Sequence, residues 1–305
     1  MEIIINQTFV LFAFATIGFT LAKFGIVKKE QSSLLSKLLV YVCYPANNLK
    51  ALGRNCTIEY LSKHYILVLS SLAILSVLIL VMHFAAKLFT SDRIKCAVYE
   101  YSLIISNFGA LGFAFAEELF GLKGLTNVII FSIPMTVYTY TYGACILSGK
   151  KMTPKNLVNP SSISLVAGIL LGVTGLGAIL PNMCFSLFDK ASYCMAPLCM
   201  LLLGIVISEF GVLEMLKNSR AYIITFLRLI AIPLAIGGVL SLLSVDRSVL
   251  VAAVLLYCMP CGMNTIVFPK NAGHDCKTGA SLSLISNLLA CGTIPLVLYL
   301  FGIYI

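Results

Sequence analysis

Apolar segments of about twenty residues, separated by short polar connections, follow one another along the whole chain. A helix needs roughly 20 apolar residues to cross about 30 Å of hydrocarbon. The pattern therefore predicts an all-α integral membrane protein with ten transmembrane helices. The predicted spans are residues 3–24, 32–53, 65–87, 96–117, 125–148, 161–181, 185–208, 221–243, 248–268 and 279–303. Polar residues interrupt the fourth, seventh and ninth spans.

Composition supports a membrane location. Of the 305 residues, 60% are hydrophobic and 11% are charged, whereas a soluble domain is about 45–50% apolar and about 25% charged. The connections are too short to hold a soluble domain, so we expect one membrane domain. The net charge of +9 does not indicate a nucleic-acid partner, because the Lys and Arg residues lie mostly in short loops and form no basic run.

The sequence carries no motif typical of catalysis. Most of the cysteines are single residues within apolar segments, where cysteine behaves as a small hydrophobic residue. Cys258 and Cys261 have CxxC spacing, but a redox function requires a soluble thioredoxin-like context. Metal-spaced His residues, HExxH, phosphate-binding and nucleophile-elbow motifs are absent from the sequence. We therefore predict that the protein is not an enzyme and binds neither a cofactor nor a metal.

The distribution of basic residues predicts the orientation in the membrane. The loops after the first, third, fifth, seventh and ninth spans contain more Lys and Arg than the loops after the even-numbered spans. The positive-inside rule places the first set in the cytoplasm. We therefore predict a multi-pass protein of the cell (plasma) membrane with both termini on the extracytoplasmic side.

The chain divides into two halves of five predicted spans, residues 1–150 and 151–305, at the loop around Met152-Thr153-Pro154. Because the number of spans per half is odd, homologous halves would be inserted upside down relative to each other. Gly and Pro residues recur at a fixed displacement, with Pro45 corresponding to Pro197. Inverted repeats with interrupted helices in corresponding positions are a sequence indication of a transporter's binding site.

The first interruption is in the fourth span, where Asn107, Gly109 and Gly112 follow Ser106. Glycines permit the helix to unwind, and unwound backbone is tolerated in a membrane only against protein or a wet cavity. The half-helix after such a break presents free N–H groups and a positive dipole end, which favour an anion. The alternative is that the small residues only permit close helix packing.

The second interruption is in the ninth span, where Pro260 is followed by Gly262 and Asn264. Proline removes a backbone donor and disrupts the preceding turn. If the two interrupted spans run in opposite directions, Asn107 and Asn264 would face one cavity with their amide groups. The alternative is a proline kink with an amide bonded to a neighbouring backbone group.

Together these residues resemble the auxin efflux carrier family of membrane transporters, which includes the PIN-type auxin carriers of plants and many bacterial members. The resemblance covers the whole chain and rests on the ten spans, Tyr44-Pro45-Ala46, Ser106-Asn107-Phe108-Gly109 with Leu111-Gly112, Met259-Pro260 with Asn264, and the run from Pro197 to Gly204. One departure is that Phe113-Ala114 stands where family members often have a proline. The bile acid:sodium symporter fold is a related architecture.

The resemblance implies a substrate site where the broken fourth and ninth helices cross near the midplane, with the two amides contacting an organic carboxylate. It also implies two bundles. The first, second, sixth and seventh spans would form a scaffold. The other six spans would form a moving unit that carries the substrate.

Few charged residues lie within the predicted spans. Arg228 is a candidate for holding a substrate carboxylate through two hydrogen bonds, and Glu100 is a candidate for proton coupling. The alternative for Arg228, and for Lys37, is that the long side chain extends to the membrane surface. Glu117 and Glu118 fall at the end of the fourth span, where we expect solvated loop charges.

These features predict a secondary active transporter that moves a small organic anion by alternating access. The predicted substrate-binding residues are Asn107, Gly109, Gly112, Pro260, Gly262 and Asn264, with Arg228 and Glu100 as charge partners. The lipid bilayer is the second expected partner. The alternatives are a channel, a solute-binding receptor and, least supported by the few titratable residues in the spans, a membrane-embedded enzyme. The sequence leaves open whether a proton or a sodium ion couples to transport and whether the chain forms a homodimer.

Overall fold

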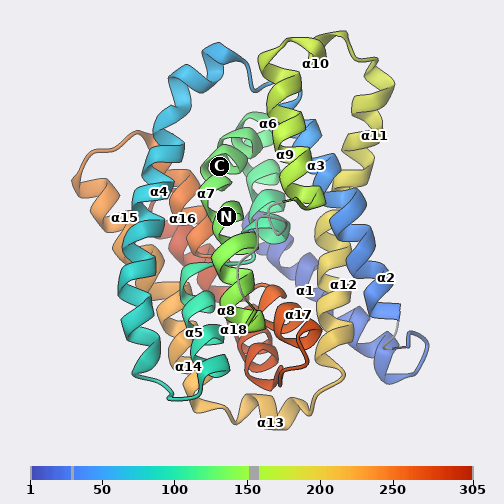
Figure 1. Cartoon of the computed structure of the whole chain (residues 1–305), viewed down its shortest axis with the longest axis vertical. Coiled ribbons are helices and arrows are strands. Elements are labelled where there is room, and N and C mark those ends of the chain that lie inside the picture. The colour runs from blue at the N-terminus through green and yellow to red at the C-terminus, as the bar shows by residue number, and fades with distance from the viewer. Residues whose placement is uncertain (1, 29–30, 151–157, 304–305) are drawn as a thin grey trace.

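The computed structural model describes residues 2–28, 31–150 and 158–303 (Figure 1). Every regular element in these residues is helical, as predicted, and no strand occurs among them. The elements before residue 151 are α1 (Glu2–Lys23), α2 (Ser32–Leu38), η2 (Leu39–Cys43), α3 (Tyr44–Leu52), α4 (Ile58–Lys87), α5 (Arg93–Ile104), η3 (Phe108–Gly112), α6 (Phe113–Phe131), α7 (Ile133–Tyr138), η4 (Thr139–Gly143) and α8 (Ala144–Ser148), where η denotes a π-helical segment.

The elements after residue 158 are α9 (Pro160–Val173), α10 (Leu176–Ile179), α11 (Asn182–Tyr193), α12 (Met195–Ile207), α13 (Val212–Leu216), α14 (Ser219–Phe226), η6 (Leu227–Ala231), α15 (Ile232–Leu242), α16 (Arg247–Tyr257), α17 (Asn264–Asn271) and α18 (Lys277–Leu300). Two of the π-helical segments, η2 and η6, are followed by Pro45 and Pro233. Proline has no N–H to donate, which disrupts the regular α-helical hydrogen-bond pattern at these points.

Six stretches of the described chain are long and apolar enough to cross a membrane. They are Glu2–Lys23, Ile58–Lys87, Arg93–Phe131, Asn182–Ile207, Ser219–Leu242 and Lys277–Leu300. Shorter apolar helices, α9 and α16, add to these. The protein is therefore a multi-pass membrane protein, whereas the count of ten spans and the inverted relation of residues 1–150 to 151–305 stay predictions. The predicted division at Met152-Thr153-Pro154 lies outside the described residues.

Polar caps place the start of several helices more precisely than apolarity does. The Thr57 hydroxyl accepts a hydrogen bond from the Tyr60 N–H (3.1 Å), so α4 begins at Ile58 and not at the predicted residue 65. The Asp92 carboxylate accepts from the Lys95 N–H (2.9 Å) at the start of α5. Each cap satisfies a backbone donor that a first helical turn leaves free. Hydropathy misses these polar first turns.

The helices pack in two groups. In the first group, α1 packs along α12, and α3 packs against α9 and α11. In the second group, α4 packs on α5, α15 on α16, α14 on α18 and α6 on α16. The groups meet along α1 and α18 and along α3 and α6. We call these the first and second helix groups below, and they correspond to the two bundles that the family resemblance implies.

Glycines bring the backbones of α1 and α12 into contact. A Cβ atom added at Gly204 would lie 1.9 Å from the Ala15 carbonyl oxygen, and one added at Gly18 would lie 2.1 Å from the Leu201 carbonyl oxygen. Atoms this close cannot coexist, so only glycine permits the observed approach. Small residues serve the same purpose in other membrane helix pairs, where close packing replaces the hydrophobic effect as the source of stability.

We predict that Gly204→Ala lowers the free energy of unfolding by about 1–3 kcal/mol, the usual cost of inserting a methyl group into a packed contact. The matched control is Gly238→Ala in α15, where an added Cβ meets no atom within 4 Å. That variant should be neutral or more stable by up to about 1 kcal/mol. Thermal unfolding of the purified protein in detergent measures both. Equal shifts in the two variants would contradict the close α1–α12 contact.

Candidate functional site

The fourth predicted span is broken at residues 105–107, which we call the first break. The α5 helix ends at Ile104, Ile105 is extended, and Asn107 has a non-helical backbone (φ −78°, ψ 49°) before η3 begins at Phe108. The Ser106 hydroxyl donates to the Leu256 carbonyl at 2.6 Å, in the last turn of α16. The break thus includes the predicted Ser106 and Asn107, whereas Gly109 and Gly112, at which unwinding was also expected, lie within η3.

The ninth predicted span is broken at residues 258–263, which we call the second break, between α16 and α17. The two breaks are in direct contact, because the Asn107 N–H donates to the Pro260 carbonyl at 2.8 Å. A Cβ added at Gly262 would lie 3.4 Å from the Asn107 Cα. The Cys261 N–H donates to the Ser286 hydroxyl of α18 at 3.0 Å. Protein groups therefore satisfy the unwound backbone that hydrocarbon would leave unpaired.

Arg228 supports both breaks. Its side chain is completely buried, Nε donates to the Met259 carbonyl (3.3 Å), and Nη1 donates to the Leu103 carbonyl (3.2 Å). These carbonyls lie where α16 and α5 end, and helix C-termini carry partial negative charge. The guanidinium also lies over the Tyr257 ring. No carboxylate of the described residues forms an ion pair with it, so the arginine adds positive charge beside the crossing.

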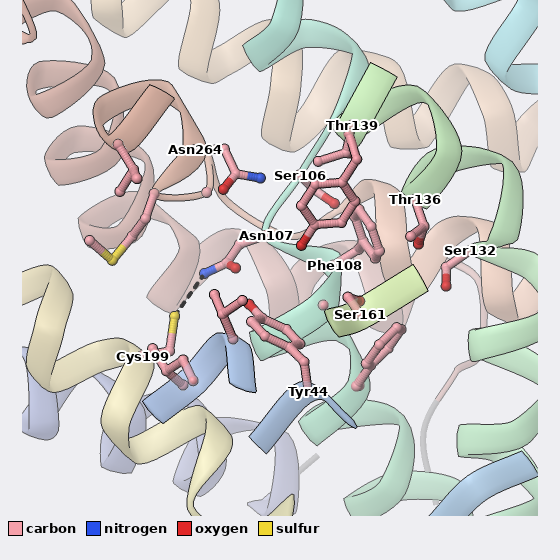
Figure 2. Close-up of a pocket in the computed structure, with 18 of the residues that line it drawn as sticks. Tyr44, Ser106, Asn107, Phe108, Ser132, Thr136, Thr139, Ser161, Cys199 and Asn264 are labelled. Atoms are coloured by element: carbon pink, nitrogen blue, oxygen red, sulfur yellow. Dashed lines mark hydrogen bonds between the residues drawn. The ribbon is translucent and has the colours of Figure 1, made fainter. Parts of the chain in front are cut away.

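A cavity of about 140 Å³ lies against the crossing, and we call it the central cavity. Figure 2 shows side chains from both helix groups directed at this space, including Tyr44, Asn107 and Asn264. Its polar lining consists of hydroxyl and amide groups, from Ser36, Tyr44, Asn48, Ser106, Asn107, Ser132, Thr136, Thr139, Tyr140, Ser161 and Asn264. None of the lining residues that the structure describes is charged. One water needs about 10–15 Å³ of such volume, so the space suits several waters or a small organic molecule.

The structure separates the predicted site residues into two sets. Asn107, Gly109, Gly262 and Asn264 line the central cavity. Gly112 does not, because it packs under the Leu256 side chain, to which an added Cβ would lie at 2.6 Å. Pro260 contributes its carbonyl to the contact between the breaks. Arg228 also lies outside the lining, where it binds backbone carbonyls and not the cavity.

The two predicted amides have different surroundings. Asn107 Nδ2 is 3.9 Å from the Cys199 sulfur of α12, a weak contact across the two helix groups (Figure 2). Asn264 Nδ2 donates to the Tyr101 hydroxyl at 2.9 Å. Each amide therefore keeps hydrogen-bonding capacity, since an amide offers two N–H donors and an acceptor oxygen.

Glu100 lies away from the central cavity. It is buried, its Oε2 is 3.2 Å from His83 Nδ1, and the Tyr142 hydroxyl donates to Oε1 at 3.4 Å. His83 in turn contacts Lys87 Nζ through Nε2 at 2.9 Å. This arrangement gives Glu100 local partners, and its predicted part in proton coupling stays a prediction.

Several cavity residues were missed by the sequence-based prediction. Ser132, Thr136, Thr139 and Tyr140 come from α7 and its surroundings. Ser132, Thr136 and Thr139 are four and three residues apart, which places them on one face of a helix, and this spacing is a signal in the sequence. Tyr44 and Asn48, in α3, have the same spacing. Hydroxyls in apolar helices more often bond their own backbone, so this signal alone is weak.

A protein-family model described as "Membrane transport protein" matches residues 3–156 and 144–298. The matched segments cover almost the whole chain and confirm the resemblance found in the sequence. No curated protein is a significant match to the chain.

We predict that Ser106→Ala lowers the free energy of unfolding by about 1–3 kcal/mol, because it leaves the buried Leu256 carbonyl without its donor. Ser76→Ala is the control, since Ser76 is exposed and bonds the Leu72 carbonyl of its own helix. That change should stay within about 0.5 kcal/mol. Thermal unfolding in detergent decides the matter, and an unchanged Ser106→Ala midpoint would show that the bond does not hold the breaks together.

Proposed function

Because the chain belongs to the membrane transport protein family, the family of the auxin efflux carriers, we propose that it is a secondary carrier of a small organic anion. The anion is a carboxylate, and it binds in the central cavity at the crossing of the two breaks. Transport proceeds by alternating access, in which one helix group shifts against the other around the bound solute.

The observation that carries this proposal is the contact between the two breaks at the wall of a polar cavity. Half-helices begin at Phe108 and Asn264, and both residues line the cavity. The first N–H groups of a helix have no partner within that helix, and they carry the positive end of its dipole. Such a terminus favours a carboxylate, and the amides of Asn107 and Asn264 add donors beside it.

The remaining lining suits the organic part of the solute. Apolar side chains such as Leu39, Phe108 and Leu165 alternate with the hydroxyl groups around the cavity. Small-molecule sites commonly combine an apolar wall with a few polar groups that fix orientation. An aliphatic or aromatic carboxylate matches this combination, whereas an inorganic ion would leave the apolar wall unused.

Arg228 supports the choice of an anion although it does not touch the cavity. Its buried charge is offset by two carbonyls and a ring, with no carboxylate of the described chain beside it. A buried charge acts over longer distances than an exposed one, because little water screens it. A bound anion would therefore gain from the arginine, and no acidic side chain of the described lining opposes it.

A channel and a receptor are the competing functions. A channel requires a continuous path, and the Asn107–Pro260 bond joins the two breaks at the crossing, which favours a carrier. Counterflow in proteoliposomes distinguishes the three functions. A carrier accelerates uptake of labelled solute when unlabelled solute is inside, a channel does not, and a receptor binds the solute without moving it.

We further place the protein in the plasma membrane with both termini outside, and we assign residues 1–150 and 151–305 as inverted repeats. A tag after Ile305 that is accessible only from the cytoplasm would overturn the orientation. A thermal-shift screen against organic acids identifies the solute class. Repeating it with and without sodium, and at two pH values, identifies a sodium ion or a proton as the coupling ion.

We predict that Asn107→Ala and Asn264→Ala each weaken carboxylate binding by about 1–3 kcal/mol, because each removes a partner from a buried polar group. Binding is measured on purified protein with the best carboxylate from the screen. Asn55→Ala is the control, since Asn55 lies in the loop after α3 and its amide donates to the Ala51 carbonyl of that helix. Unchanged binding in both cavity variants would overturn the proposed site.

We predict that Arg228→Gln weakens binding of the carboxylate more than binding of its uncharged amide. The difference should be about 1–2 kcal/mol, the coupling of two unit charges about 10 Å apart at an effective dielectric constant of about 20. Arg228→Lys keeps the charge and should retain most of the difference. Equal losses for the two ligands would show that Arg228 acts only on the shape of the breaks.

A further inference from the structure

Lys50 is the centre of a buried ion network that lies away from the central cavity. The residue is 6% exposed, and its ammonium group forms ion pairs with the carboxylates of Glu117 and Asp189, the latter at 2.6 Å. It also donates to the Ser192 hydroxyl (3.3 Å) and lies over the Tyr193 ring at 4.3 Å. We call these five residues the Lys50 cluster. The sequence analysis expected Glu117 to be a solvated loop charge, and its ion pair with the buried Lys50 corrects this.

The cluster follows the central cavity along α3 and α6. In α3, the cavity residues Tyr44 and Asn48 precede Lys50. In α6, Phe113 lines the cavity, and Glu117 is one turn further along. Figure 1 shows α3, α6 and α11 in the upper part of the molecule, whereas α2, α8 and α17 are in the lower part.

Both helix groups contribute residues to the cluster, but the first group contributes more of them. Asp189, Ser192 and Tyr193 all belong to α11, which packs against α3 in the first helix group. Lys50 therefore keeps a carboxylate, a hydroxyl and a ring when that group moves as a unit. Glu117 comes from α6, in the second group, and it is the cluster's only contribution from there among the described residues. The Lys50–Glu117 pair is thus the ion pair that must break if the groups separate here, together with the hydrogen bond that the Thr126 hydroxyl of α6 donates to the Ala51 carbonyl of α3 (3.0 Å).

A second cavity of about 160 Å³ lies beside the cluster. Its lining includes Asn47, Ala114, Glu117 and Ser192. The Asn47 Nδ2 atom is buried and has no hydrogen-bond partner in the described chain. A buried donor without a partner is unfavourable, so this arrangement fits a site that water enters when the helix groups move apart.

We propose that the Lys50–Glu117 pair closes the path from the second cavity to the crossing, and that its breakage opens the carrier on that side. The proposal rests on the proposed transport function and adds the group that controls access. Because Asp189 retains Lys50 in both states, opening leaves no lysine without a partner. Glu117 then faces the second cavity, where water hydrates it.

A second ion pair joins the helix groups at the opposite end. Lys270 of α17, a helix that packs against α5 and α18 of the second group, is 2.8 Å from Glu209, which follows α12 of the first group. The Lys270 and Glu209 side chains are 47% and 13% exposed, against 7% and 20% for Lys50 and Glu117. Water and salt reach the Lys270 ammonium and screen its pair more than the Lys50–Glu117 pair. The buried Lys50–Glu117 pair is accordingly the stronger restraint, and this structure represents the state closed on the side of the Lys50 cluster.

The test is the reactivity of a cysteine introduced as Ala114→Cys, at the lining of the second cavity. The protein is reconstituted in sealed vesicles of one orientation, and an impermeant maleimide is added on the side of α10 and α11. The native Cys194 is exposed and also reacts with maleimide. The labelling rate is therefore compared with that of the same chain without Ala114→Cys. Adding Glu117→Gln should raise the rate about tenfold, which corresponds to about 1.4 kcal/mol in the equilibrium between the two states.

Two variants separate closure from a general structural role. Asp189→Asn leaves the Lys50–Glu117 pair in place and should raise the rate much less, whereas Glu117→Asp keeps the charge and should restore most of the closure. Glu59→Gln is the matched control, because it breaks the exposed Glu59–Lys63 pair of α4. If Glu117→Gln does not yield monodisperse protein, Lys50→Gln tests the same pair.

An unchanged rate in Glu117→Gln, or an equal rise in Asp189→Asn, would overturn the proposal. The labelling needs no substrate, so its outcome is independent of solute identity. Normal counterflow with unchanged labelling would therefore reject only the proposal that the Lys50–Glu117 pair closes the carrier. Absent counterflow would reject the proposed carrier function itself.

Discussion

The structure depends on one constraint, which is that hydrocarbon cannot satisfy a backbone N–H or C=O group. Two interrupted helices are therefore stable only if each supplies what the other lacks. Ser106 donates to the end of α16, the Asn107 N–H donates to Pro260, and Arg228 donates to one carbonyl beside each break. Neither break would be stable alone, so the pair forms one structural unit. The polar cavity exists because this unit leaves two half-helix N-termini at its surface.

The charged side chain of this unit, Arg228, lies at the breaks and does not line the central cavity. The arginine faces the C-terminal ends of α5 and α16, and the cavity receives the N-terminal ends of the following half-helices. A lysine or arginine in the cavity would hold an anion strongly and slow its release. Helix termini and amides would bind an anion by partial charges, which suits the proposed carrier because a carrier must release its solute after every cycle.

The sequence predicted the breaks because their cause is local. Asn107, Gly109, Pro260 and Gly262 disfavour a continuous membrane helix wherever they occur together. The sequence did not predict that Arg228 binds the carbonyls beside the breaks or that Lys50 forms a buried ion network. Each of these roles depends on partners far along the chain. Lys50 lies near the end of a predicted span, where a lysine normally reaches water, and only the folded chain brings Asp189 to it. Helix ends were missed for a simpler reason, since capped first turns are polar.

Motion between the helix groups is consistent with the way polar contacts are distributed. Within the first group, Asn48 bonds Ser161 and Ser164, and within the second group the breaks bond each other. Across the groups near the cavity, Asn107 makes only a long contact with Cys199, and Gly109 faces the Tyr44 ring, to which a Cβ would lie at 3.0 Å. A smooth glycine surface opposite an aromatic ring resists sliding less than interlocked side chains do. Beside Lys50 the groups are joined by the Lys50–Glu117 ion pair and by the Thr126–Ala51 hydrogen bond, and at the opposite end by the Lys270–Glu209 pair. We therefore expect these bonds, more than the weak contacts at the centre, to control the proposed motion.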